Sequence, residues 1–86
     1  MGCTVYILFS KSCGKFYTGQ TQHFENRLIE HNTGETKSIK SCLPWVVVWK
    51  TDLVGRSEAI RLERKIKSRG AERFLHDLGI TVSRGA

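Results

Sequence analysis

The chain has 86 residues, of which 40% are hydrophobic, and this is enough for one compact core but not for two independent ones. Fourteen Lys and Arg against eight Asp and Glu give a formal charge of +6, which favours a polyanionic partner over an acidic or neutral one. The size excludes a large multi-step enzyme, and the apolar content excludes a disordered tail.

The first half of the chain is predicted to form a β-hairpin followed by a helix. Residues 4–9 and 15–20 are runs of β-branched, aromatic and aliphatic residues, and a polar connector joins them. A helix is expected over about 22–33, because apolar residues recur there at helical spacing. Thr21 can cap the start of this helix, and Gly34 supplies a stop signal.

The second half is predicted to add a strand and two helices. Residues 45–49 form an apolar strand that follows a polar loop. Residues 57–67 carry apolar side chains at offsets of three and four, which predicts a helix. Gly70 separates this helix from a shorter one over 71–78, and the following residues have no periodicity.

The order strand, strand, helix, strand, helix, helix has too few alternations for a doubly wound sheet. It indicates a small α+β fold in which three helices flank a three-stranded, mainly antiparallel sheet. We expect one domain over residues 1–86, with a core at about 4–78 and a tail at 79–86.

Cysteine usage and hydropathy indicate the compartment. Cys3, Cys13 and Cys42 are an odd number without a Cys-x-x-Cys pair, so neither a disulfide framework nor a cysteine zinc site is indicated, and reduced thiols are expected. The longest apolar stretch, 45–49, is far shorter than the ~20 residues that span a bilayer, and no basic leader precedes the first apolar run. These features predict a cytoplasmic protein without a membrane segment.

Glu63 is an acidic residue on a helix face that ought to be apolar. At 100° per residue it lies about 40° from Ala59, within the stripe that also contains Ile66. An unpaired carboxylate in such a place needs a cation, a donor network or a metal. The alternative is that Glu63 lies at the rim of the core and forms an ordinary salt bridge.

The first helix has the same pattern with the opposite charge. Arg27 and His31 lie within about 60° of Phe24, on the side that faces the core. If both helices pack on one sheet, Arg27 and Glu63 approach each other, either as a plain ion pair or as parts of a catalytic site. His31 is a partly buried histidine or a catalytic base, and a poor metal ligand because no second His or Cys lies at ligand spacing.

The hairpin carries two phenols, Tyr6 and Tyr17. Their rings project from one face of the sheet if the register places them opposite each other, and a slip of one residue separates them. The sequence leaves this register open, and tyrosine in a strand is usually a packing residue. Gly19 has no side chain, which suits the close approach of a phosphate or of another backbone.

Residues 56–73 hold seven cations and three anions. Such helices are usually solvated faces, although a clustered excess of positive charge is typical of phosphate binding.

Tyr6, the tripeptide Tyr17-Thr18-Gly19, Arg27 and Glu63 occur in an order and spacing that resembles the GIY-YIG nuclease domain. The resemblance covers about residues 4–78. The segments around Arg27 and Glu63 look like the small stand-alone (UPF0213/Uri-like) branch of that family.

The resemblance implies a divalent-metal-dependent endonuclease. Glu63 would hold one Mg²⁺ or Mn²⁺ ion, and Arg27 would pair with the scissile phosphate. Tyr6 would orient or deprotonate the attacking water, Tyr17 would line the phosphate site, and His31 is the rival base.

The resemblance also implies a nucleic-acid partner, with DNA favoured over RNA. The expected reaction is a nick in one strand of the DNA, and structured DNA in repair or recombination is among the expected substrates. We expect a monomer or weak dimer, no membrane partner, and a protein partner that supplies specificity. The residues expected to contact nucleic acid are Gly19, Arg27, Lys37, Lys40, Arg64 and Lys67.

Departures from the family pattern leave a second hypothesis open. Thr4-Val5-Tyr6 stands for Gly-Ile-Tyr, Tyr17-Thr18-Gly19 stands for Tyr-Ile-Gly, and no asparagine follows Glu63. A catalytically weak or inactive nucleic-acid-binding module of the same fold would carry the same signature.

Overall fold

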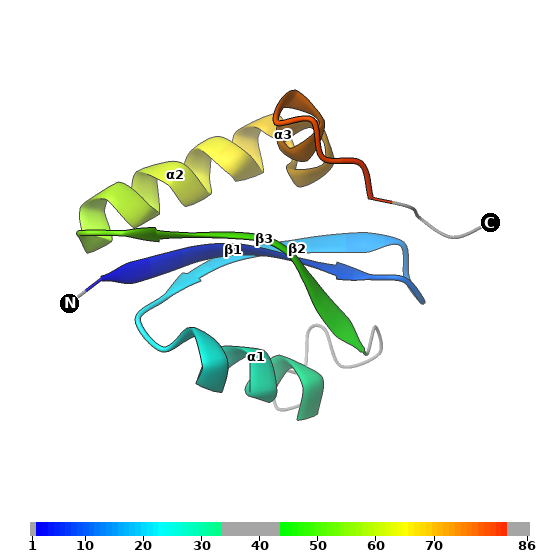
Figure 1. Cartoon of the computed structure of the whole chain (residues 1–86), viewed down its shortest axis with the longest axis horizontal. Helices are drawn as coiled ribbons and strands as arrows, with labels where there is room; N and C mark the ends of the chain where they lie inside the picture. The colour runs from blue at the N-terminus through cyan, green and yellow to red at the C-terminus, as the bar shows by residue number, and fades with distance from the viewer. Residues whose placement is uncertain (1, 34–43, 83–86) are drawn as a thin grey trace.

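The computed structural model describes residues 2–33 and 44–82, with the backbone alone for residues 30–33. The three strands form one antiparallel sheet in the order β2-β1-β3. Helix α1 covers one face of this sheet, and α2 and α3 cover the other (Figure 1). The predicted fold class and element order are confirmed: the elements are β1 (Cys3–Ser10), β2 (Lys15–Thr21), α1 (Phe24–Thr33), β3 (Trp45–Leu53), α2 (Arg56–Arg69) and α3 (Ala71–Asp77).

β1 is the central strand, and both of its faces are buried. Its continuous apolar run suits this place, because a strand that is covered on two sides need not alternate apolar and polar residues. Cys3, Val5 and Ile7 pack on the face that α2 and α3 cover, which we call the α2 face. Tyr6 and Leu8 pack on the opposite face, which we call the α1 face. The sheet therefore separates two core clusters.

Helices α2 and α3 close the α2 face. Ile66 of α2 and Leu75 of α3 are buried against β1, and Trp49 packs edge-on against Phe74 with ring centroids 5.1 Å apart. The predicted break between the helices falls at Gly70, whose φ of 95° is a conformation that favours glycine. Within the part of the chain that is described, no helix is both long and apolar enough to span a membrane.

β3 contains a β-bulge. The pairing register between β1 and β3 shifts between Ile7 and Leu8, which leaves Val48 as an extra residue of β3. In an unbroken strand, two residues that are four apart share a face. Because of the bulge, Trp45 packs on the α1 face and Trp49 on the α2 face.

Three element boundaries differ from the prediction by more than one residue, and one of them is the end of α2, which lies at Arg69, two residues further than expected. β3 continues to Leu53, four residues further than expected, and the Thr4 hydroxyl donates a hydrogen bond of 2.7 Å to the Asp52 carboxylate there. α1 begins at Phe24, because the Thr21 hydroxyl accepts a hydrogen bond of 3.0 Å from the His23 amide in the turn before the helix. Thr21 therefore shapes the turn and does not cap the helix.

The cysteines differ in state. Cys3 is a buried free thiol that donates a hydrogen bond of 2.9 Å to Gln20 Oε1. Cys13 is disulfide-bonded, so the prediction of reduced thiols is confirmed for Cys3 and wrong for Cys13. Spacing along a chain does not reveal which thiols the fold brings within bonding distance. Cys42 lies outside the described residues.

Candidate active site

Tyr6 is the centre of the α1 face. Its side chain is almost completely buried, at 1% exposure, and it lies opposite Gly19 in the pairing of β1 with β2. A Cβ atom at position 19 would lie 2.6 Å from the Tyr6 hydroxyl oxygen and 2.8 Å from Cζ. The close approach that the sequence predicted at Gly19 is therefore made by a phenol and not by a backbone.

The second phenol stands diagonally across the hairpin. Tyr17 pairs with Leu8, two residues beyond Tyr6, so both phenols project from the α1 face. Their rings stack with centroids 6.4 Å apart and an interplanar angle of 27°. The edge of Trp45 contacts Tyr17 at a centroid distance of 6.2 Å. The register that the sequence left open thus brings the two tyrosines together.

Arg27 reaches this pair from α1. Its side chain is half-buried and forms a hydrogen bond with Tyr6, in which the guanidinium donates to the phenol oxygen. The predicted core-facing position of Arg27 is therefore confirmed. His31 lies one helical turn further along α1, and its side chain lies outside the described part of the chain.

Glu63 approaches from α2. Its side chain is 20% exposed, and its ion-pair partner is Lys67, one turn further along the helix, with an Nζ to Oε2 distance of 3.3 Å. Of the alternatives weighed from the sequence, the salt bridge at the rim of the core is present, and Lys67 is its cation. The Glu63 carboxylate also acts electrostatically on Tyr6.

The surroundings of Tyr6 raise its pKa to about 12. Burial is the main cause, since it penalises the phenolate, and the neighbouring Tyr17 adds to it. The hydrogen bond and positive charge of Arg27 oppose this shift, whereas the charge of Glu63 adds a smaller increase. Tyr6 therefore remains a neutral phenol near neutral pH.

Both helices pack on the sheet, but Arg27 and Glu63 do not meet on one face of it, so the approach of Arg27 to Glu63 that the sequence suggested is not found there. α1 and α2 lie on opposite faces (Figure 1), so Arg27 and Glu63 come from opposite sides. Lys67, the partner of Glu63, lines a hollow of about 400 Å³ together with Tyr17 of the edge strand β2. We infer that the negative charge of Glu63 influences the phenols past the β2 edge of the sheet and not across a shared face.

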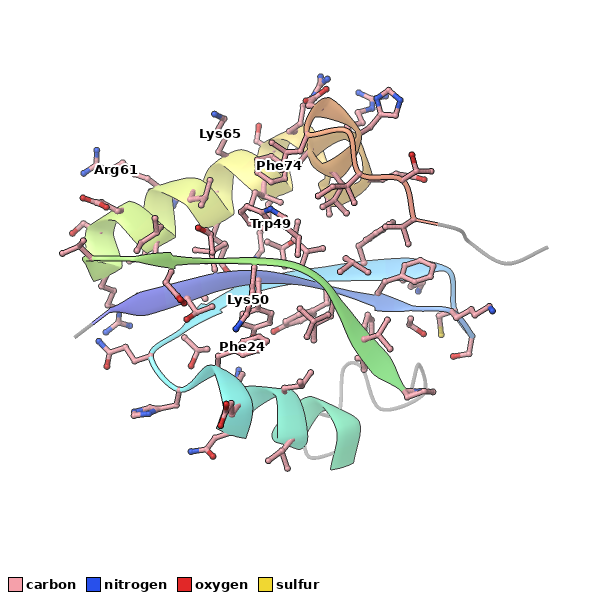
Figure 2. All side chains as sticks on the ribbon, viewed as in Figure 1. Phe24, Trp49, Lys50, Arg61, Lys65 and Phe74 are labelled. Atoms are coloured by element: carbon pink, nitrogen blue, oxygen red, sulfur yellow. The ribbon has the colours of Figure 1, made fainter. Side chains whose placement is uncertain are left out.

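The other predicted contacts with nucleic acid are placed as follows. Lys67 lines the hollow beside Tyr17, and Arg64 is exposed on α2. Lys37 and Lys40 lie outside the described residues. Arg61 and Lys65 point away from the sheet on the outer side of α2 (Figure 2).

A hard divalent ion such as Mg²⁺ requires oxygen ligands, and few of the described side chains near Tyr6 supply them. Among the side chains that the structure describes, those of residues 2–29 and 44–82, no group of three or more His, Cys, Asp and Glu could hold a metal. The site offers one partly exposed carboxylate, Glu63. Mg²⁺ commonly binds one or two carboxylates and takes its other ligands from water and phosphate oxygens, so this carboxylate fits such an ion only together with a phosphate substrate.

Two neighbours of Tyr6 were not identified from the sequence. The Phe24 ring contacts the Tyr6 ring in a T-shaped arrangement at 5.3 Å, and Lys50 lies opposite Tyr6 in the pairing of β1 with β3. Phe24 appears in the sequence only as an apolar helix position. No sequence signal marks Lys50, because its face depends on the β-bulge.

The fold and the site together define a GIY-YIG catalytic domain. A family model with that description matches residues 2–73, so the chain belongs to this family. GIY-YIG proteins are endonucleases, and this membership supports a hydrolase that acts on nucleic acid.

Similar proteins indicate to which branch of the GIY-YIG family the chain belongs. The chain is 38% identical over 65 residues to a UPF0213 protein of Staphylococcus haemolyticus, and the match covers 74% of this chain and 78% of that protein. It is also similar to the solution NMR structure of a UPF0213 protein from Bacillus halodurans, with a TM-score of 0.58 and 28% identity. That match covers 92% of this chain and 84% of the other. The predicted small UPF0213 branch is confirmed.

Proposed function

We propose that this protein is a divalent-metal-dependent endonuclease that cuts one strand of DNA at a time, including structured DNA of repair or recombination. The observation that supports this most is the environment of Tyr6. Its buried hydroxyl bonds with Arg27 and experiences the charge of Glu63. A phenol and a guanidinium thus meet on the α1 face, and the charge of a carboxylate on α2 reaches the phenol from the other side of the sheet (Figure 1).

Arg27 is the proposed contact to the scissile phosphate. A guanidinium presents several N–H donors in a plane, so it can bond the Tyr6 oxygen and still donate to a phosphate oxygen. As charge develops on the phosphate oxygens during hydrolysis, a donor that is already held in place stabilises it without reorganisation.

Tyr6 is proposed to orient the attacking water. With a pKa of about 12 the phenol keeps its proton near neutral pH, so it is a poor base unless a bound metal lowers that value. Its oxygen accepts a hydrogen bond from Arg27, and a phenol hydroxyl can in addition donate its proton to a water or a phosphate oxygen. Deprotonation of the water falls to Tyr17 or His31 in this proposal.

Glu63 is the proposed metal ligand. A divalent ion held there would act as a Lewis acid on the phosphate and would stabilise the leaving 3′ oxygen. Lys67 neutralises the Glu63 carboxylate at 3.3 Å in the structure. Since phosphate also attracts an ammonium group, Lys67 can move to the substrate when a metal takes the carboxylate.

The test is nicking of supercoiled plasmid and of a branched oligonucleotide, with Mg²⁺, with Mn²⁺ and with EDTA. Glu63→Gln is expected to lower the rate on the order of 10³-fold while DNA affinity stays within about twofold, because the variant removes a charge that phosphate does not need. Glu58→Gln is the matched control, since Glu58 is exposed in the first turn of the same helix.

Two outcomes would overturn the proposal. Cutting that persists in EDTA would refute the metal requirement. Tight binding without cutting of any DNA, under any metal condition, would favour the non-catalytic binding module. The single carboxylate that the described side chains supply at the site and the absence of an asparagine after Glu63 also favour that alternative. An RNA hairpin of the same sequence, run in parallel, tests the preference for DNA.

A further inference from the structure

Three residues form a row across the sheet at the level of Tyr6. Gly19 of β2 and Lys50 of β3 are its direct partners on either side. Directly opposed residues of antiparallel strands place their side chains on the same face. Lys50 therefore belongs to the α1 face together with Tyr6, on the side away from the β2 edge.

The β-bulge is what gives Lys50 this position. In an unbroken strand, Trp45 and Lys50 would lie on opposite faces, because they are five positions apart and side chains alternate between the faces. With it, Trp45 packs in the same cluster as Tyr6, and Lys50 also pairs with Tyr6. Bulges occur often beside active sites, where they redirect a side chain.

The Lys50 ammonium is held by an aromatic ring. Its Nζ lies 4.9 Å from the centroid of the Phe24 ring, and Phe24 in turn contacts Tyr6 at 5.3 Å. Figure 2 shows Lys50 extending from β3 toward α1, with Phe24 beside it. Among the side chains of residues 2–29 and 44–82, no carboxylate forms an ion pair with Lys50, and nearby Asp52 accepts a hydrogen bond from Thr4. The charge is thus positioned and remains available to an anion.

Lys50 borders an open cavity of about 330 Å³ between β3 and the start of α1. This volume lies in the range of small-ligand pockets and suits a single nucleotide. The lining offers a cation for a phosphate and polar groups that can bond the edge of a base, and it consists of His23, Phe24, Glu25, Asn26 and Lys50.

We propose that this cavity is a nucleotide subsite, in which Lys50 binds the phosphate next to the cleaved one and Glu25 and Asn26 face the base. Carboxylate and amide side chains are the usual partners of exocyclic amines of bases. This inference rests on the proposed nuclease function, because that function places the cleaved phosphate at Arg27. The substrate strand would cross the α1 side from the β2 edge toward β3.

The first experiment measures binding in EDTA, where cleavage does not interfere. The fluorescence anisotropy of a labelled branched oligonucleotide gives the dissociation constant at a series of salt concentrations. Lys50→Gln is expected to weaken binding about fivefold and to reduce the salt slope by about 0.9, the value for one lost phosphate contact. Lys50→Arg should keep the wild-type slope. An unchanged slope for Lys50→Gln would overturn the subsite.

The second experiment locates the contact. A single uncharged methylphosphonate is placed in turn at each phosphate around the cleavage position. At one adjacent position it should weaken binding by the wild type but not by Lys50→Gln, because the two changes remove the same interaction. The control Lys15→Gln, on the exposed hairpin end of β2, should remain additive at that position. Additivity of Lys50→Gln at every position would refute the proposal.

These measurements separate the subsite from the nuclease proposal. A protein that binds with the expected coupling but cuts nothing would retain the subsite and lose the proposed reaction. A protein that nicks DNA in a metal-dependent way but shows no coupling at Lys50 would retain the reaction and lose the subsite.

Discussion

The buried centre of the α2 face consists of small and aliphatic side chains, whereas the buried centre of the α1 face consists of Leu8 and two aromatic side chains with polar atoms, Tyr6 and Trp45. On the α2 face, Ile7 and Ile66 are buried among other apolar residues. On the α1 face, Tyr6 is buried to a similar degree, yet its hydroxyl bonds with Arg27. Alternate residues of one strand, β1, supply both clusters.

This difference shows how a short chain can separate stability from chemistry. A buried hydroxyl is costly unless it has a hydrogen-bond partner, so Arg27 is needed for Tyr6 to be buried at all. The apolar cluster of the α2 face needs no such hydrogen-bond partner. We therefore expect substitutions on the two faces to have different consequences, and four of them test this.

The largest change in stability is expected on the α2 face. Ile66 has no exposed surface, and Ile66→Ala leaves a cavity that the surrounding helices and strands fill only partly. The free energy of unfolding should fall by about 2–5 kcal/mol, as measured by urea denaturation. The nicking rate per folded molecule should stay within about twofold of wild type, because the variant leaves the α1 face unchanged and removes buried atoms of α2 without altering the partly exposed carboxylate of Glu63. A rate loss that exceeds the unfolded fraction would contradict the separation of the two faces.

Among substitutions of uncharged residues, the largest change in nicking rate is expected at Gly19. A Cβ there would lie 2.6 Å from the Tyr6 hydroxyl oxygen and 3.3 Å from Cε1 of Tyr17. Gly19→Ala must displace the Tyr6 phenol from Arg27, and a misplacement of about 1 Å costs on the order of 100-fold in rate. The matched control is Gly55→Ala, where a Cβ meets no atom within 4 Å. Equal nicking by both variants would show that the position of Tyr6 does not matter.

Much of this arrangement could be predicted from local patterns. Helical periodicity identified Glu63 and Arg27 as charged residues on inward faces, and the structure leaves both partly buried. The hairpin and the helix break at Gly70 followed from turn signals and composition. Such features depend on neighbours within a few residues along the chain, which a sequence displays directly.

The remaining features depend on contacts between distant segments. The register that places Tyr6 opposite Gly19 is set by the whole hairpin and its burial, and a slip of one residue leaves the local pattern unchanged. The bulge at Val48 reverses the faces of the residues after it, so Lys50 could not be assigned. The placement of the two helices on opposite faces also has no local signature.

A smaller effect concerns pH. The pKa of Tyr6 is about 12 in the folded protein, compared with about 10 in an unfolded chain. Between these pH values the unfolded state loses the Tyr6 proton before the folded state does. The contribution of this proton to the free energy of unfolding is therefore complete below about pH 10 and is lost as the pH rises toward 12. The melting temperature of the wild type should therefore fall relative to that of Tyr6→Phe over this range. Parallel melting curves would assign the pH dependence to other groups.

The smallest effect is expected at the ion pair that links α2 to the site. Lys67 is 60% exposed and pairs with Glu63 at 3.3 Å, so a metal ion that binds Glu63 must displace an ammonium group that is only weakly held. Exposed pairs one helical turn apart contribute about 0.3–0.5 kcal/mol, which corresponds to roughly a twofold change in an equilibrium constant.

Lys67→Met should therefore raise the affinity for Mn²⁺ about twofold, as followed by electron paramagnetic resonance in the absence of DNA. Lys65→Met removes the same charge from the outer side of α2, away from Glu63, and controls for the overall charge (Figure 2). If both variants bind Mn²⁺ equally well, Lys67 and the metal do not compete for Glu63.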